Sequence, residues 1–494
     1  MFGVVSAGRA VVAAILVLLC GAIGACVAMS PYVAFAVVCV FGLMVAWFFP
    51  RSFVLVTAVS LLLMRTLIVA TGIGALGGLD EACVIICAVC FIGRRLAEKR
   101  ELRKVPGFYL IAAFAVVGFV SSFIEGVPIY VSLSGASLVL KGLLLAFAVA
   151  QIDWRESDLR KVVFFGAIVI AFILVCTLVN LIAPGFWLNT VLNAPKYSDR
   201  FGLKPVLGPF IHPGYFGSVM ALSGLAILAY RTHVGRGRVS LVLGLASVLA
   251  MLLTLRRKVV LGAVSGASLI AVLRYGRFSL TWITGILVIV GILFWTLIQD
   301  VLSATYSEYV ENYEQVARIR LYLDGFDLAL HNFPFGVGFG RFGSATARAT
   351  YSPIYYDLGY PSIWGLGPTD ETGKFLTDTF WPGIVAETGL IGLVLFASFL
   401  VVIFRFGRLV TRRAGSGRRL SAWLGVTLCA WTVQMVVESV AGAVFTAAPT
   451  YGLYFGLLGI VVAISQVDAE ADRLCIGNSR FRSVASATVS GQDE

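Results

Sequence analysis

Charged side chains are scarce in this chain of 494 residues. Asp, Glu, Lys and Arg make up 13% of it, whereas apolar residues make up 59%. This composition excludes a soluble globular domain and is typical of a polytopic membrane protein. Basic residues exceed acidic ones by 12, but they gather in short loops beside apolar segments, as in 94–104 and 405–419. Such loops orient a membrane protein and contact anionic lipid, so the excess does not indicate a nucleic-acid partner.

Metal-ligating and nucleotide-binding patterns are also missing. The chain has three histidines, and no His, Asp or Glu cluster stands at ligand spacing. Cys83, Cys87 and Cys90 share a helix face, but no His or carboxylate joins them, so we interpret them as small packing residues. No glycine-rich phosphate loop or dinucleotide fingerprint stands between a strand and a helix. We therefore expect no metal and no cofactor.

Long apolar segments predict an all-α integral membrane protein with about 12–14 transmembrane helices. The expected helices lie near 10–29, 32–49, 52–71, 78–93, 107–124, 128–150, 162–183, 214–230, 239–254, 258–273, 279–299, 380–404, 421–442 and 449–466. If the N-terminus is cytoplasmic, the basic loops all fall on the cytoplasmic side. Two segments, 184–213 and 300–378, are then left on the outer side.

This map divides the chain into five parts. They are N-terminal transmembrane helices (1–183), transmembrane helices with a first outer loop and a basic outer turn (184–299), an extracytoplasmic loop domain (300–379), C-terminal transmembrane helices (380–466) and a cytoplasmic tail expected to be disordered (467–494). The outer loop is too long for a passive connection, which indicates a function. Its many aromatic side chains either hold sugar rings or form the loop's own core and interfacial belt.

A basic triplet, Arg256-Arg257-Lys258, falls on the predicted outer side. Because the positive-inside rule disfavours it there, an anion bound at that surface is the best explanation. Guanidinium groups bind phosphate with two parallel bonds, so a lipid-linked diphosphate is the obvious candidate. Further ionisable candidates in or beside spans are Arg65, Lys141, Arg200, Lys204, His212, Arg318, Arg320, His331, Arg341, Glu387 and Glu438. For Arg65 and Lys141, snorkelling or a pair with Glu387 or Glu438 is an equal alternative.

Several stretches, taken in order, resemble motifs of one family. Residues 200–217 (RFGLKPVLGPFIHPGYFG) resemble its Gly-x-Phe-x-x-Pro-Asn box, with Gly214 in place of Asn. Residues 254–262 (TLRRKVVLG) resemble its Thr-x-Ser-Arg turn, with Arg256 where Ser is usual. Residues 318–322 and 334–340 resemble its Arg-x-x-x-Trp and Pro-x-x-Gly-x-Gly pair, and 381–392 resembles its closing Glu-x-Gly-x-x-Gly helix. On these residues the chain resembles the O-antigen ligase and polymerase superfamily, also called the Wzy/WaaL family.

This resemblance implies a metal-independent membrane glycosyltransferase of the GT-C kind in a bacterial inner membrane, with its active site on the extracytoplasmic side. The donor would be a glycan linked to undecaprenyl diphosphate, and the acceptor a glycan or a lipid-borne sugar. Arg257 and Arg318 would bind the diphosphate, with support from Arg200, Arg65, Arg256 and Arg320. Membrane lipid is a further expected partner.

The chain departs from the family at the expected catalytic base. Asp378 stands where the family has His, nine residues before Glu387. A carboxylate can accept the proton of the acceptor hydroxyl, so we predict Asp378 as the catalytic residue and favour a surface-polysaccharide polymerase over an O-antigen ligase. His331, His212 and Glu387 are alternative bases or supporting residues. A flippase for lipid-linked oligosaccharide is the alternative from another class, although the expected internal repeat is missing.

Overall fold

The structure is a computed structural model that describes residues 31–194, 206–276, 316–414 and 418–467. Within these residues it is entirely helical. Nine of the described helices are long and apolar enough to cross a membrane, and Phe35–Phe48, Phe108–Ile124 and Arg238–Leu252 are shorter apolar helices. The protein therefore has the architecture of a multi-pass membrane protein. The predicted helices at 10–29 and 279–299 lie outside the described residues.

The observed helices include the spans predicted within the described residues, most of them within a few residues at each end, although the one predicted at 162–183 begins six residues earlier and the one predicted at 380–404 ends ten residues later. They are α2 (Pro31–Phe48), α3 (Pro50–Thr71), α4 (Leu79–Ala97), α5 (Phe108–Ile124), α6 (Ile129–Ala150), α7 (Glu156–Ile182), α8 (Pro213–His233), α9 (Arg238–Leu252), α10 (Arg257–Tyr275), α13 (Ala317–His331), α14 (Ala345–Thr350), α15 (Pro353–Asp357), α16 (Trp381–Ala414), α17 (Arg419–Ser439) and a last helix, Thr450–Val467. Short 3-10 helices η1 (Gly74–Gly78) and η5 (Tyr360–Ser362) and the π-helix η2 (Phe186–Val191) complete the set.

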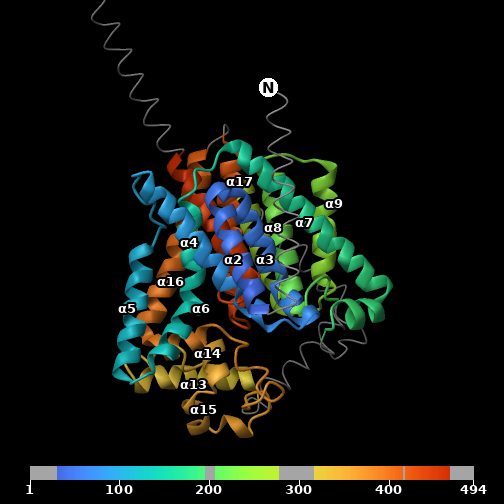
Figure 1. The fold of residues 1–494 in the computed structure, drawn as a ribbon. Coiled ribbons are helices and arrows are strands. Elements are labelled where there is room, and N and C mark those ends of the chain that lie inside the picture. The colour runs from blue at the N-terminus through green and yellow to red at the C-terminus, as the bar shows by residue number, and fades with distance from the viewer. Residues whose placement is uncertain (1–30, 195–205, 277–315, 415–417, 468–494) are drawn as a thin grey trace, which may run out of the picture.

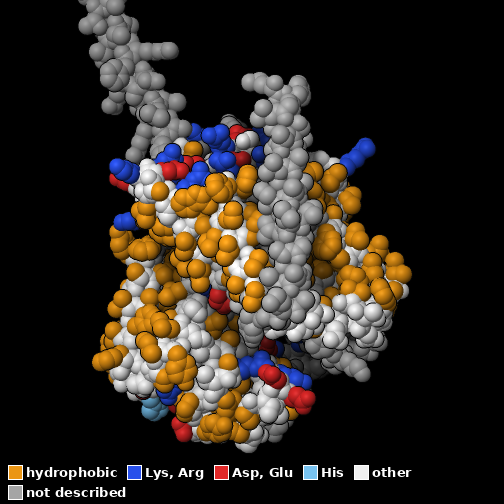
Figure 2. Space-filling view, viewed as in Figure 1, with side chains coloured by type: hydrophobic (Ala, Val, Ile, Leu, Met, Phe, Trp, Pro, Cys, Tyr) orange, Lys and Arg blue, Asp and Glu red, His pale blue; other side chains and the backbone are white. Residues whose placement is uncertain are grey.

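The molecule has two distinct ends. Helices α13, α14 and α15 lie together beyond one end of the bundle, which we call the loop end (Figure 1). Lys and Arg side chains gather at the opposite end, which we call the basic end (Figure 2). The 94–104 loop lies at this end beside the turn between α6 and α7, to which Arg95 donates a hydrogen bond at Gln151 O (3.2 Å). The predicted grouping of basic loops matches this arrangement.

Residues 316–379, the loop segment, have an apolar core of their own. Phe342, Tyr351, Tyr355 and Tyr360 are buried in it, and the rings of Tyr355 and Tyr360 stack with centroids 5.2 Å apart. Stacked and edge-to-face aromatic pairs stabilise such a cluster beyond the area they bury. For these rings the interpretation as loop core is therefore correct, whereas Trp364 remains 77% exposed.

The glycine-rich stretch of the loop segment threads between helices of the bundle. Backbone N–H groups of Val337 and Gly338 donate to the carbonyls of Ala386 (2.8 Å) and Glu387 (3.0 Å) in α16. This contact lies at a kink in α16, where Gly389 has a non-helical φ of 65°. A Cβ on Gly389 would lie 2.1 Å from the Pro334 carbonyl oxygen, so only glycine fits there. The stretch thus fixes the loop segment to the bundle.

Helix α5 holds the same stretch from the other side. Ser121 Oγ donates to Gly336 O (2.8 Å), and Phe339 N donates to Ser122 Oγ (2.9 Å). The Phe339 ring packs against Phe114 with centroids 5.8 Å apart. These contacts place the loop segment, and with it α13, at a fixed position on the bundle.

Candidate functional site

An accessible ion pair between Arg318 and Asp378 stands at the loop end. Asp378 Oδ2 accepts from Arg318 Nε (2.8 Å) and from Nη2. The two side chains are 32% and 29% exposed, so the pair is reachable from solvent. Both bonds end on Oδ2, and Oδ1 of Asp378 has no hydrogen-bond partner within the described residues. The Phe375 ring lies beside the guanidinium, 6.0 Å from its centroid to Arg318 Cζ.

Contacts around the pair hold α13 and α16 against α17. Tyr322, one turn after Arg318, donates its hydroxyl to Val440 O (2.8 Å) just beyond α17. Burial raises the pKa of Tyr322 to about 12, so the phenol stays protonated as a donor. Trp381 Nε1 donates to Ser439 Oγ (2.9 Å) at the start of α16. The first turn of α13 and Asp378, three residues before α16, are thereby held side by side.

The basic triplet meets this pair through Lys258. Its Nζ donates to Ala441 O, just after α17. Arg256, Arg318, Asp378 and Glu438 all lie close enough to act electrostatically on the Lys258 ammonium group. Three cations and two carboxylates, drawn from four segments of the chain, therefore share one region at the loop end.

The turn before α10 points the side chains of the basic triplet in different directions. Leu255 has φ of 54°, a left-handed conformation that residues other than glycine rarely adopt. It is followed by Arg256, which is half-buried, and Arg257, which is exposed. Lys258 is the residue of the triplet that faces α17. Arg257, predicted as a main diphosphate ligand, lies at the same turn but on its exposed side.

Glu438 is a buried carboxylate beneath the site. It is 1% exposed near the end of α17, and its carboxylate accepts from Ser218 Oγ of α8 and from Gln434 Nε2. Such bonds satisfy a carboxylate that burial would otherwise destabilise. Glu438 therefore connects α8, α10 and α17 at the point where their ends meet.

Arg65 of α3 and His212, which precedes α8, form a second group around Tyr215 near the start of α8. The Arg65 guanidinium lies over the Tyr215 ring, 5.6 Å from its centroid, and the His212 and Tyr215 rings are 5.2 Å apart. His212 Nδ1 accepts from Gly214 N (3.0 Å), so this imidazole caps the start of α8. His212 has a structural role there, and Arg65 comes to the loop end as predicted.

Three predicted site residues are occupied elsewhere. Arg320 pairs with Asp324 (2.9 Å), which also accepts from the Tyr360 hydroxyl (3.0 Å) inside the loop segment. Burial raises the pKa of Asp324, so these donors compensate a carboxylate of the loop core. His331 is at the other end of α13, about 20 Å along the axis from Arg318, where Nδ1 contacts Asp327 O (3.0 Å).

Glu387 is the third of these residues. It is 4% exposed, and its Oε1 accepts from Ser344 Oγ (2.8 Å) and from Phe342 N (3.1 Å). Glu387 therefore anchors the glycine-rich part of the loop segment rather than facing the Arg318–Asp378 pair. Lys141, for which a pair with Glu387 or Glu438 was one alternative, instead binds Asp80 and Glu81, the latter at 2.8 Å.

The remaining points concern two predicted residues of the first outer loop and the search for a metal site. Arg200 and Lys204 lie outside the described residues. Within the described ranges no group of three or more His, Cys, Asp or Glu side chains could hold a metal ion. The sequence analysis placed Lys258 in the basic triplet but did not assign it as a diphosphate ligand, and its contact with Ala441 beyond α17 is a long-range one that no local sequence signal shows.

Comparison of the chain with protein-family models and with curated proteins gives no match. The class that the fold and composition define is a multi-pass membrane protein with a polar, positively charged site at its loop end.

Proposed function

We propose that the protein is a membrane glycosyltransferase that moves a glycan from undecaprenyl diphosphate to an acceptor sugar hydroxyl. The reaction would take place at the outer leaflet of a bacterial inner membrane. The proposal rests chiefly on one observation, the accessible Arg318–Asp378 pair beside Lys258 and Arg256. The motif resemblance described above supports the same assignment. Within it, we favour a surface-polysaccharide polymerase of the O-antigen or exopolysaccharide type.

Charge supports an anionic substrate at this place. Three cations face two carboxylates around Lys258, and Arg257 adds an exposed positive charge at the same turn. A diphosphate bound there would neutralise the excess of positive charge. Arg side chains are well suited to this because the guanidinium stays charged and binds phosphate oxygens in pairs. A lysine ammonium adds a compact charge that can follow the leaving oxygen.

The proposed chemistry is a single displacement at the anomeric carbon. The acceptor hydroxyl gives its proton to Asp378, whose Oδ1 carries no hydrogen bond within the described residues. Its oxygen forms the new bond to the anomeric carbon while the bond to the diphosphate oxygen breaks. Undecaprenyl diphosphate leaves with the added negative charge, which Arg318, Arg256 and Lys258 stabilise. The anomeric configuration is inverted by this path.

A pair of variants tests the anion site in cells that display the polysaccharide. Arg318→Gln removes the charge but keeps most of the side-chain volume, and we expect it to shorten or abolish the polysaccharide ladder. Arg348→Gln is the matched control, because Arg348 lies in the same loop segment and pairs with the fully exposed Asp370 (2.8 Å). Protein amounts in the membrane fraction are measured in parallel. A normal ladder from Arg318→Gln at normal protein level would rule out this site.

A second assay separates polymerase from ligase. The purified protein is supplied with the lipid-linked repeat as both donor and acceptor, without any lipid A-core sugar. A polymerase extends the repeat, so products of several units are expected. If product forms only when a core acceptor is added, the ligase assignment replaces the polymerase. Transfer of labelled lipid-linked sugar across liposomes without any elongation would favour the flippase instead.

A further inference from the structure

A cavity of about 360 Å³ lies at the basic end, far from the loop segment. It is bounded by the junction of α2 and α3, the last turns of α4, and the turn between α6 and α7. Four basic and three acidic side chains line it: Arg51, Arg94, Arg95, Lys161, Glu98, Asp153 and Asp158. A lining this rich in Arg and Lys at a helix–lipid boundary is suited to an anionic ligand.

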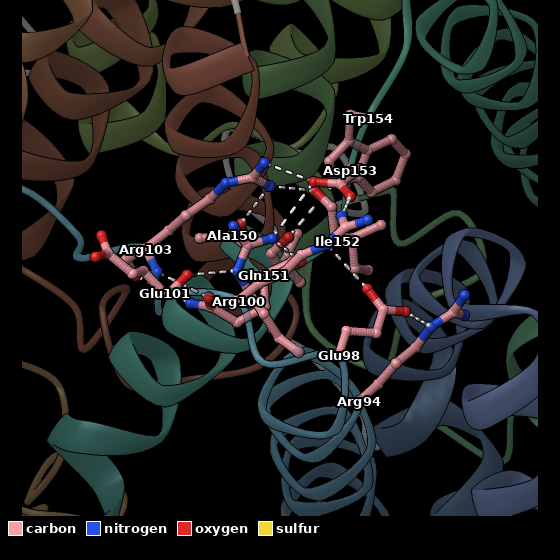
Figure 3. A network of polar contacts seen from close by, with 12 residues as sticks. Arg94, Glu98, Arg100, Glu101, Arg103, Ala150, Gln151, Ile152, Asp153 and Trp154 are labelled. Atoms are coloured by element: carbon pink, nitrogen blue, oxygen red, sulfur yellow. Dashed lines mark hydrogen bonds and ion pairs between the residues drawn. The ribbon is translucent and has the colours of Figure 1, made fainter. Parts of the chain in front are cut away.

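Arginines outside the cavity compensate much of its acidic charge. Asp153 accepts from Arg103 (2.5 Å) and Arg100, and more weakly from Arg95 (3.4 Å), as Figure 3 shows for the first two. Burial alone would raise the pKa of Asp153, but these guanidinium charges and hydrogen bonds lower it below the usual value. Arg100 and Arg103 do not line the cavity. Within the lining, Arg51 pairs with Asp158 (3.1 Å) and Arg94 pairs with Glu98 (3.0 Å). Counted with Arg100 and Arg103, the basic side chains around the cavity still outnumber the acidic ones.

Unused donors remain on these lining residues. Arg51 bonds through Nε and Nη2, and Arg94 through Nε and Nη1, which leaves one Nη of each without a partner among the described residues. Arg95 is only 8% exposed. Its Nε and Nη1 are bonded, and its Nη2 makes no hydrogen bond to the part of the chain that the structure describes. Lys161 contacts only Asp158, at 3.9 Å.

Apolar side chains flank the opening. Phe48 and Phe49 line the cavity and are 67% and 60% exposed, and Trp47 nearby is 42% exposed. They occupy the junction of α2 and α3, which for helices that cross a membrane lies near the membrane surface. Aromatic side chains at this depth contact acyl chains and the headgroup boundary. The ligand that fits has a negatively charged head and an apolar body.

We propose that this cavity binds the phosphate headgroup of an anionic phospholipid, with the acyl chains lying along Phe48 and Phe49. The inference does not depend on the proposed glycosyl transfer. The positive-inside rule assigns this end to the cytoplasmic leaflet, which is the leaflet rich in anionic lipid. The shared chemistry is a phosphate, and a soluble phosphate ester lacks the apolar part that the exposed rings would contact.

Lipid titration of the full-length protein in neutral detergent tests this. Native mass spectrometry and thermal unfolding are followed against phosphatidylglycerol, phosphatidylcholine and soluble glycerol 3-phosphate. The test variant is Arg51→Gln with Arg94→Gln, and Lys161→Gln is a milder variant at a residue whose side chain is 78% exposed. The control is Arg160→Gln, because Arg160 is 75% exposed at the same end and pairs only with Glu156 (3.3 Å) among the described residues.

We expect saturable binding of phosphatidylglycerol that is about thirtyfold weaker in the double variant, since each of the two basic residues contributes about 1 kcal/mol near the surface. Lys161→Gln should weaken it by a smaller factor and Arg160→Gln should leave it unchanged. Equal affinities of wild type and double variant would overturn the proposal. An equal loss in the Arg160 control would mean unspecific surface attraction. Stabilisation by glycerol 3-phosphate but not by the lipid would mean a soluble anion site.

Discussion

Replacing Glu387 distinguishes an anchor of the loop segment from a catalytic base. The carboxylate receives two hydrogen bonds, from Ser344 Oγ (2.8 Å) and Phe342 N (3.1 Å). A hydrogen bond to a charged group contributes about 1.5–3 kcal/mol, and a buried donor left unpaired costs about 1–3 kcal/mol. Removing the buried charge also removes its desolvation cost, which offsets part of the lost hydrogen-bond energy. Glu387→Ala should therefore destabilise the fold by about 3 kcal/mol. Glu387→Gln keeps an acceptor oxygen, and we expect a loss of about 1 kcal/mol.

Thermal unfolding of the detergent-solubilised protein, followed by size-exclusion chromatography, measures these differences. Glu371→Ala is the control, because Glu371 is exposed in the same loop segment. The Tm should fall in the order wild type and Glu371→Ala, then Glu387→Gln, then Glu387→Ala. Glu387→Gln should also keep glycosyl-transfer activity. If Glu387→Ala unfolds with wild-type Tm, or Glu387→Gln is stable but inactive, the anchoring role is wrong.

Two further substitutions test how the ends of the bundle are held. Gly135→Ala would place a Cβ 2.4 Å from the backbone nitrogen of Gly340, so we expect it to lower the free energy of unfolding by about 1–3 kcal/mol. The control Gly166→Ala, with open space around it, should leave the Tm unchanged. Similar Tm values for both variants would contradict the close packing. Asp153→Asn leaves buried Arg103 without its carboxylate, and because Asp153 is 40% exposed and therefore partly screened by solvent, it should cost about 1–2 kcal/mol at pH 7. Because the folded-state pKa of Asp153 is lowered, wild type loses this advantage progressively as pH falls below about 4. A Tm difference that does not narrow as the pH is lowered would contradict the ion-pair explanation.

Helix positions were predictable because local signals are strong. The apolar run at 214–230 was predicted as a helix and is observed as Pro213–His233, with Pro at its first turn and the His212 side chain as cap. The nearly continuous run from 239 to 273 was predicted as two helices, and Leu255 with φ of 54° separates them. In each case the chain's own hydropathy and turn chemistry decide the structure.

Long-range pairing was not predictable in the same way. The partner of Arg318 is 60 residues away, and nothing in the spacing of the two residues selects Asp378 over other carboxylates. Glu387 was considered as a base, but its bonds to the glycine-rich stretch arise only when that stretch enters the kink of α16. Tertiary contacts of this kind decide whether a buried charge serves chemistry or architecture.

The most direct test of the proposed transfer site is the rate of glycosyl transfer by purified Asp378→Asn protein. The lipid-linked repeat is the substrate, and the Tm of the variant is measured to confirm that it is folded. Loss of a general base reduces a rate by about 10²–10⁴-fold, so we expect wild type to form product and Asp378→Asn to fall by at least about a hundredfold. A folded Asp378→Asn protein that transfers glycan at the wild-type rate would contradict the assignment of the Arg318–Asp378 pair as the transfer site.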